Sequence, residues 1–359
     1  MSRCRFIMPL SIILSMLLLI SCAVTPATSQ TPERPGHGTV EPTPDRPVGW
    51  RAVTDQAGRT VVLDARPERI VSGFYISTST IMAIGVADRL VGIEARAESR
   101  PIYELANPEL LTLPSVGTAR DFNLEACLEL RPDLVILPYR QREVAEILYE
   151  MNVPAILVNP ESVDEMLEMI ALIGNATGAE SSANRLIGWY QSALAEIRQQ
   201  VAGVTEKPVV YMTGTSSWLT TSSNDMFQAW LIDVAGGINA TRDIEGSGRI
   251  EVSYEQLLAM NPDIIIIPPE ADFGIRNILY DPNLSQLTAV RNRRVYKMTP
   301  EYEAWDSPIP SSILGAKWLT RILHGGHDSA SAVEDITPYV ISFYEDFFGY
   351  KFEAPLPGT

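Results

Sequence analysis

One stretch of sequence occurs twice in the chain, and this repeat limits the fold more than any other feature. The segment 123–138 reads NLEACLELRPDLVILP, and the segment 253–268 reads SYEQLLAMNPDIIIIP. Each begins with a residue that favours a helix N-terminus, continues as a short helix and is stopped by Pro-Asp. Four aliphatic residues then predict a strand that is buried on both faces, and such strands need helices on both sides of a parallel sheet. The sequence therefore predicts an α/β fold with two Rossmann-like lobes.

Other segments fit the same plan. Short aliphatic runs predict further strands at 69–72, 90–93, 153–158, 208–212 and 295–298. Apolar periodicity predicts one helix after the first strand and two near the C-terminus, at 77–85, 311–323 and 333–348.

A longer helix is predicted between the two lobes, at about 181–201. One apolar stripe runs along it, made of Leu186, Trp189, Tyr190, Leu194 and Ile197. A single helix holds two lobes apart more rigidly than a loop does. We therefore expect an N-terminal lobe at 50–180, a connecting helix at 181–203, a C-terminal lobe with its helices at 204–359, and a ligand cleft between the lobes.

The N-terminal segment has the layout of an export signal. Arg3 and Arg5 precede an apolar run from Phe6 to Ile20, which is shorter than the roughly 20 residues that span a bilayer. The run ends in Leu-Ile-Ser-Cys22, which resembles the lipobox of bacterial lipoproteins, where the cysteine is lipidated and becomes the first residue of the mature protein. A plain secretory signal with a chance cysteine is the alternative. We expect a signal peptide at 1–22 and a lipid anchor on Cys22 outside the cytoplasmic membrane.

A polar spacer follows the signal. Residues 23–49 contain six prolines and almost no large apolar side chains, which is typical of an extended, solvated tether.

Composition excludes several classes of protein. The net charge of −16 disfavours nucleic-acid binding, because an acidic surface repels phosphates. The three cysteines cannot form a disulfide framework, and only Cys127 lies in the folded part, where a buried position is expected. No cofactor and no metal site are expected.

The order of these motifs resembles a known family. The motifs are Ile-Val-Ser at 70–72, Leu-Val-Gly at 90–92, the first Glu…Pro-Asp unit, Ala-Gly-Gly-Ile-Asn at 235–239 and the second Glu…Pro-Asp unit. Over about residues 54–323 the chain resembles the substrate-binding proteins of bacterial ABC importers for iron–siderophore complexes, haem and cobalamin. The resemblance implies two α/β lobes bridged by one long helix, a ligand in the cleft and delivery of that ligand to an ABC permease with its ATPase subunits. It implies no catalysis.

Arginines near the predicted strand ends favour an anionic ligand. Arg120 and Arg249 lie five and six residues before the repeated glutamates, Arg140 follows a predicted strand, and Arg242 is a further candidate. Cobalamin-binding relatives tend to carry tryptophan near these positions, so the chain departs from them. Guanidinium groups match carboxylate, catecholate, phosphate and oxyanion oxygens. Solvated loop arginines are the alternative interpretation.

Aromatic and hydroxyl side chains occur in the same turns, where ligands collect beyond the carboxyl ends of parallel strands. The candidates to line a chelate pocket are Tyr75, Ser77, Tyr139, Trp218, Tyr302 and Trp305. Packing at the rims of the lobes is the alternative for each ring.

Glu125 and Glu255 occupy the same position in the two repeats, two residues after each helix N-cap. The helix dipole alone favours an acid there. The resemblance implies a further role, in which the two glutamates dock to arginines of a two-subunit permease.

Two other classes of protein, an enzyme and a lipid-anchored scaffold, are alternatives to a binding protein, and several ligands are possible. An enzyme is disfavoured, because none of the three histidines is placed for general-base chemistry and no phosphate loop or nucleophile elbow occurs. A lipid-anchored scaffold would not explain the repeat. Among ligands, a ferric siderophore is the first choice, molybdate or tungstate suits the arginines equally, and a corrinoid or haem is the remaining alternative.

Overall fold

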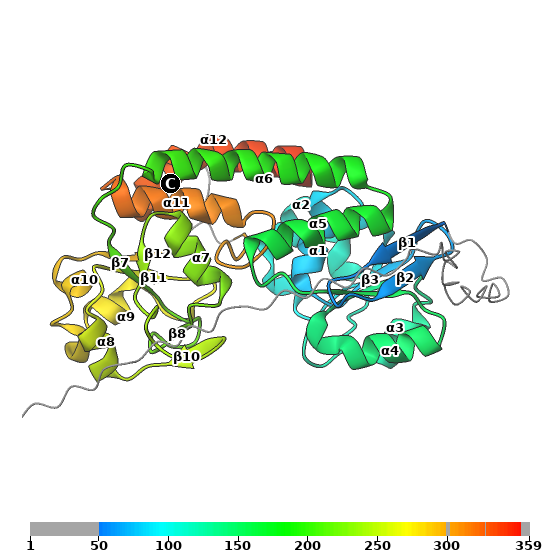
Figure 1. Cartoon of the computed structure of the whole chain (residues 1–359), viewed down its shortest axis with the longest axis horizontal. Helices are drawn as coiled ribbons and strands as arrows, with labels where there is room; N and C mark the ends of the chain where they lie inside the picture. The colour runs from blue at the N-terminus through cyan, green and yellow to red at the C-terminus, as the bar shows by residue number, and fades with distance from the viewer. Residues whose placement is uncertain (1–49, 299–301, 327, 353–359) are drawn as a thin grey trace, which may run out of the picture. The chain divides into compact units, whose positions relative to one another are not determined.

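The computed structural model describes residues 50–298, 302–326 and 328–352, so the predicted signal peptide, the tether and Cys22 lie outside the described residues. Two separate four-stranded parallel sheets are present, which confirms the prediction of two α/β lobes (Figure 1).

The sheet of the N-terminal lobe has the strand order β4-β3-β5-β6. Its strands are β3 (Ile70–Ser72), β4 (Leu90–Gly92), β5 (Leu134–Pro138) and β6 (Ala155–Val158). A separate antiparallel hairpin is formed by β1 (Arg51–Thr54) and β2 (Thr60–Leu63). The helices are α1 (Tyr75–Ala83), α2 (Pro101–Ala106), α3 (Leu124–Glu129), α4 (Arg142–Glu150) and α5 (Val163–Thr177). Short 3-10 turns occur at η1 (Ala87–Arg89), η2 (Ala97–Ser99), η3 (Pro108–Thr112) and η4 (Tyr139–Gln141).

The sheet of the C-terminal lobe has the order β12-β11-β7-β9. Its strands are β7 (Val209–Met212), β9 (Ile238–Asn239), β11 (Ile264–Ile267) and β12 (Val295–Lys297). An antiparallel pair is formed by β8 (Thr220–Ser222) and β10 (Arg249–Glu251). The helices are α7 (Phe227–Val234), α8 (Tyr254–Met260), α9 (Ile275–Leu279), α10 (Thr288–Arg291), α11 (Ser312–His324) and α12 (Ser329–Phe348), with a 3-10 turn at η5 (Pro282–Leu284).

The repeated strands are buried on both faces, as their sequence predicts. In β11, Ile264 and Ile266 belong to one hydrophobic cluster, whereas Ile265 and Ile267 belong to another. The alternation follows from the two-residue period of a strand. Each sheet therefore separates two cores.

The aspartate of each Pro-Asp pair has the same structural role in both lobes. The carboxylate of Asp133 accepts hydrogen bonds from the backbone N–H of Glu68 and Arg69, just before β3. The carboxylate of Asp263 accepts one from Val209 at the start of β7. The repeat thus joins each buried strand to its neighbour in the sheet.

The connecting helix α6 (Glu180–Val201) is present where the apolar stripe predicts it. Leu186, Tyr190, Leu194 and Ile197 are buried, and the half-buried Trp189 packs on Phe343 of α12. The helix contacts α5 and α11 (Figure 1).

The last helix begins four residues earlier than the expected start at residue 333. The side chain of Asp328 accepts a hydrogen bond from the backbone N–H of Ser331, which caps α12 at Ser329. The apolar pattern does not reveal this cap, because the first turn precedes the apolar residues. Among the described residues, no helix is both long and apolar enough to cross a membrane.

Candidate ligand site

A cavity of about 480 Å³ lies between the two lobes. Its walls are formed by segments that follow β3 and β4 in the N-terminal lobe and β11 and β12 in the C-terminal lobe. These are the carboxyl ends of parallel strands, where open α/β sheets bind ligands. The N-terminal lobe contributes Tyr75, Ser79, Arg96, Ser99, Arg100, Pro101, Ile102 and Tyr103, and the C-terminal lobe contributes Pro269, Glu270, Asp272, Tyr302, Glu303, Ala304 and Ile309.

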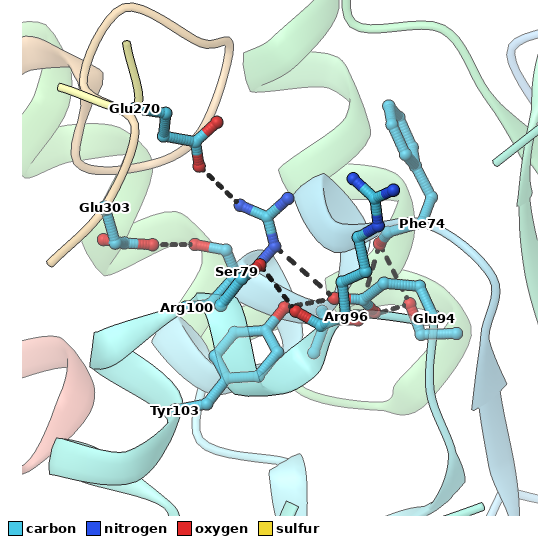
Figure 2. Close-up of polar contacts among 11 residues, drawn as sticks. Phe74, Ser79, Glu94, Arg96, Arg100, Tyr103, Glu270 and Glu303 are labelled. Carbon is cyan, nitrogen blue, oxygen red and sulfur yellow. Dashed lines mark hydrogen bonds and ion pairs between the residues drawn. The ribbon is translucent and has the colours of Figure 1, made fainter. Parts of the chain in front are cut away.

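Arg100, which directly precedes α2, reaches from one lobe to the other (Figure 2). Its guanidinium carbon lies 3.8 Å from the centroid of the Tyr75 ring, and its Nη1 donates to Glu270 Oε1 at 3.3 Å. Its Nε lies 3.9 Å from Glu94 Oε1. A guanidinium that is held by a ring and by flanking carboxylates has lost much of its freedom already, so binding another oxygen anion costs little further ordering.

Glu94 is the buried support of Arg100. Its two carboxylate oxygens accept hydrogen bonds from Thr78 Oγ1 at 2.6 Å and from the Tyr103 hydroxyl at 2.7 Å (Figure 2). The side chain is 5% exposed, and burial raises its pKa above the usual value. Glu94 is not one of the residues that line the cavity, and both of its carboxylate oxygens already accept hydrogen bonds. We therefore assign Glu94 the role of positioning the Arg100 guanidinium, and not of contacting the ligand.

Glu303 joins the two lobes at the cavity wall. Its Oε1 accepts a hydrogen bond from Ser79 Oγ of α1 at 2.7 Å, and its Oε2 accepts one from the Tyr344 hydroxyl of α12 at 3.0 Å. The backbone N–H of Ile102 also donates to the carbonyl of Tyr302 across the lobes. Burial raises the pKa of Glu303.

Asp306 is a third buried carboxyl next to the cavity residues. It is 5% exposed, and Gln228 Nε2 approaches its Oδ2 at 3.5 Å. Burial, reinforced by the charge of Glu270, raises its pKa from 3.8 to about 6, while Arg249 opposes the shift. The folded protein therefore binds a proton here that the unfolded chain releases at a lower pH.

Asp306→Asn should remove part of the pH dependence of stability. Between about pH 4 and about pH 6 the native state holds more protons at this site than the unfolded chain, so its stability falls as the pH rises through that range. A pKa raised from 3.8 to about 6 corresponds to about 3 kcal/mol. Thermal melts at both ends of the range should show the variant gaining stability relative to wild type at the higher pH. An equal difference at both ends would contradict this.

Two of the predicted aromatic residues line the cavity. Tyr75 and Tyr302 come from opposite lobes. Burial raises the pKa of Tyr75 to about 12, which disfavours its phenolate. The Tyr302 hydroxyl has no hydrogen-bond partner within the described part of the chain.

Three of the arginines that the sequence proposes as ligand contacts, Arg120, Arg140 and Arg249, are not among the residues that line the cavity. All three are exposed. Arg120 lies in a turn where the Thr118 hydroxyl accepts from the backbone of Arg120 and Asp121, and this turn leaves the guanidinium in solvent. The guanidinium groups at the cavity belong instead to residues 96 and 100.

Arg96 and Arg100, which follow β4, are cavity residues that the sequence analysis did not predict. Their signal was available in the sequence, since both follow the predicted strand at 90–93 by a few residues. Arg242 lines a second cavity of about 560 Å³, together with Lys207 and Trp230.

The other predicted residues lie apart from the cavity lining. Ser77 is fully buried in α1, and its Oγ has no hydrogen-bond partner among the described residues. Tyr139 is exposed, and Trp218 packs edge-on against Phe273.

Trp305 belongs to the core instead of the cavity wall. The side chain is fully buried, and its indole N–H donates to the Tyr344 hydroxyl at 3.1 Å. The backbone of Gly315 leaves room for it, because a Cβ at that position would come within 2.9 Å of Trp305 Cβ. Packing in the core therefore explains why a residue as large as tryptophan occupies position 305.

Trp305→Leu should consequently reduce stability more than ligand affinity. The smaller side chain leaves a cavity and removes the donor to Tyr344, so we expect a loss of about 2–4 kcal/mol in the free energy of unfolding. Denaturant titration measures it, and Trp218→Leu serves as the control because that ring is only half-buried. Unchanged stability with lost ligand binding would restore Trp305 as a ligand contact.

Glu125 and Glu255 are both exposed in the first turns of α3 and α8. The N-caps are also equivalent, since Asn123 accepts from the backbone N–H of Ala126 and Ser253 accepts from that of Gln256. The repeat therefore presents one exposed carboxylate at the same place on each lobe.

The family of the chain follows from its sequence. Residues 70–302 match the family described as periplasmic binding protein. The chain belongs to the periplasmic binding protein family. The match covers both parallel sheets and all of the cavity residues except Ala304, Ile309 and Glu303.

Three known proteins illustrate the relationship of this periplasmic binding protein to others. It is 24% identical over 266 residues to YvrC, an ABC transporter substrate-binding lipoprotein of Bacillus subtilis, covering 71% of this chain and 80% of the relative. It is 23% identical over 326 residues to the molybdate-binding protein MolA of Haemophilus influenzae, covering 83% and 91%. It is 24% identical over 247 residues to the Fe(3+) dicitrate-binding protein FecB of Escherichia coli, covering 68% and 80%.

A solved structure shares the fold of this periplasmic binding protein. The structure of MolA bound to molybdate aligns with a TM-score of 0.75 at 21% identity, and covers 84% of this chain and 99% of MolA. The two-lobed architecture is therefore that of the family.

Proposed function

We propose that the protein captures a small metal chelate, with a ferric siderophore or ferric hydroxycarboxylate complex as first choice, and delivers it to an ABC permease. The observation that carries the proposal is the guanidinium of Arg100, which is held against Tyr75 at the wall of an interlobe cavity. Oxygen atoms that coordinate iron keep negative charge and accept hydrogen bonds from such a group. The name of FecB supports the choice of an iron chelate, and the name of YvrC supports delivery to an ABC transporter.

The size and chemistry of the cavity favour a chelate over the alternatives. A volume of about 480 Å³ suits a small organic complex, whereas a tetrahedral oxyanion would leave most of it empty. Haem needs an axial ligand, and no histidine is among the described residues that line the cavity. Two tryptophans that could have stacked on a corrin face, at positions 218 and 305, lie outside the cavity lining.

Molybdate is the second candidate. The relationship to MolA extends over 91% of that protein, and a pair of arginines suits an oxyanion. An enzymatic role finds no support among the three relatives, whose names describe binding proteins or transport components.

Native mass spectrometry with metal analysis of the protein purified from its own cells tests the proposal. We expect a stoichiometric complex that contains iron and an organic chelator. Thermal-shift measurements with ferric citrate, a ferric hydroxamate, molybdate and cobalamin give a second readout, because a ligand stabilises the state that it binds. Stabilisation by molybdate alone, or chemical conversion of the bound ligand, would contradict the proposal.

The same proposal includes a lipid anchor on Cys22 and docking through Glu125 and Glu255. The signal layout, the proline-rich spacer and the lipoprotein relative support the anchor. Cys22→Ser should release the protein from the membrane fraction, as immunoblots of separated fractions would show. Retention of the variant on the membrane would remove the anchor from the proposal.

A further inference from the structure

The charged residues at the cavity are divided by sign between the lobes. The N-terminal lobe contributes two charged lining residues, Arg96 and Arg100, and both are basic. The C-terminal lobe contributes three, Glu270, Asp272 and Glu303, and all are acidic. The cavity therefore has one positive and one negative wall.

An ion pair between Arg100 and Glu270 joins the two walls. Arg100 Nη1 lies 3.3 Å from Glu270 Oε1, and the two side chains remain 19% and 49% exposed (Figure 2). Both groups can therefore meet a ligand that enters the cavity. An anion that binds Arg100 competes with Glu270 for the same guanidinium.

A purely anionic ligand that binds Arg100 would take from Glu270 its ion-pair partner. Displaced from Arg100, Glu270 faces the cavity together with Asp272, and none of the described lining residues of that lobe is basic. Lys297 of the same lobe donates to the carbonyl of Ala271 and is not among the lining residues. Glu303 is already hydrogen bonded within the protein, because Ser79 and Tyr344 donate to its two carboxylate oxygens. Uncompensated carboxylates beside a bound anion oppose binding.

We propose that the ligand carries a protonated amine at one end as well as metal-bound anionic oxygens at the other. The oxygens bind the arginine wall and the ammonium group takes the place of Arg100 beside Glu270 and Asp272. Both partners of the broken ion pair are then satisfied by one molecule. This inference rests on the proposed function, and it narrows the substrate class to amine-bearing chelates.

Two iron complexes that differ in a single charge test the inference. The iron(III) complex of desferrioxamine B carries a free ammonium group, and the complex of its N-acetyl derivative does not. Titration followed by tryptophan fluorescence should show about tenfold tighter binding of the first complex to the wild type. The double variant Glu270→Gln, Asp272→Asn should bind both complexes equally. The control variant Asp243→Asn, Glu245→Gln, which changes exposed acids outside the cavity lining, should keep the difference.

Ferric citrate, which carries no amine, separates this inference from the proposed function. It should bind the wild type weakly and the double variant more tightly. Equal affinity of the two hydroxamate complexes for the wild type, or binding of ferric citrate alone, would overturn the inference and leave the proposed function standing. If none of the three complexes binds, both fall.

Discussion

Arg100→Met should weaken the binding of the metal chelate about a hundredfold. The loss has this size because the guanidinium is the half-buried donor at the cavity wall, and truncating one partner of such a charge pair costs about 2–5 kcal/mol. Isothermal titration with the chelate found by mass spectrometry measures the change. The Arg100 guanidinium is also the cation beside the buried carboxylate of Glu94. Its removal leaves that carboxylate without a counter-charge, so the variant loses stability as well.

A second variant separates the loss of binding from the loss of stability. Arg100→Met combined with Glu94→Gln removes the buried carboxylate that would otherwise lack its cation, and it should restore the melting temperature without restoring affinity. Arg198→Met changes an exposed arginine of α6 and should affect neither. Recovery of binding in the double variant would show that Arg100 acts only through the fold.

Charge reversal at Glu125 and Glu255 should abolish uptake and leave ligand binding intact. Both carboxylates are exposed, and each follows its N-cap by two residues on the corresponding helix of each lobe. Two equivalent carboxylates are complementary to a permease that has a basic site on each of two equivalent subunits. A lysine at position 125 and at position 255 would repel these basic sites. Uptake of radioactive iron complex by cells carrying the double variant measures the effect, and titration of the purified variant measures binding.

Exposed acids elsewhere supply the control for docking. Glu168→Lys with Glu334→Lys makes the same change of net charge on α5 and α12, and we expect normal uptake. Normal uptake by the Glu125, Glu255 variant would refute docking through these residues. Equal loss in both double variants would point to net charge as the cause.

The fold could be predicted from the sequence because its main signals are local. Four aliphatic residues in a row, at 134–137 and 264–267, are sufficient to indicate strands that are buried on both faces. The structure has the buried strands β5 and β11 at these positions. The apolar stripe of α6 is equally local, since residues three and four positions apart share a helix face. The start of α12 was missed because its first turn carries no apolar signal and depends on the cap at Asp328.

The candidate site was only partly predictable. Tyr75 and Tyr302 were found because they follow strands or precede helices, but the same reasoning also selected Arg120, Tyr139 and Arg140, which are exposed. Position at a strand end places a residue at the correct edge of a sheet. It does not determine whether the side chain reaches the cavity.

The sequence by itself determined the repeat, the two sheets and the helix that connects them, since burial pattern and periodicity act over a few neighbouring residues. Only the tertiary structure decided which charges meet. Arg100 and Glu270 are far apart along the chain and come from different lobes, and the pair exists because the lobes face each other. Trp305 likewise lies in a strand-end segment by sequence and in the core by structure, because α11 and α12 close over it. Side-chain contacts between distant segments depend on how the lobes pack, and no local pattern carries that information.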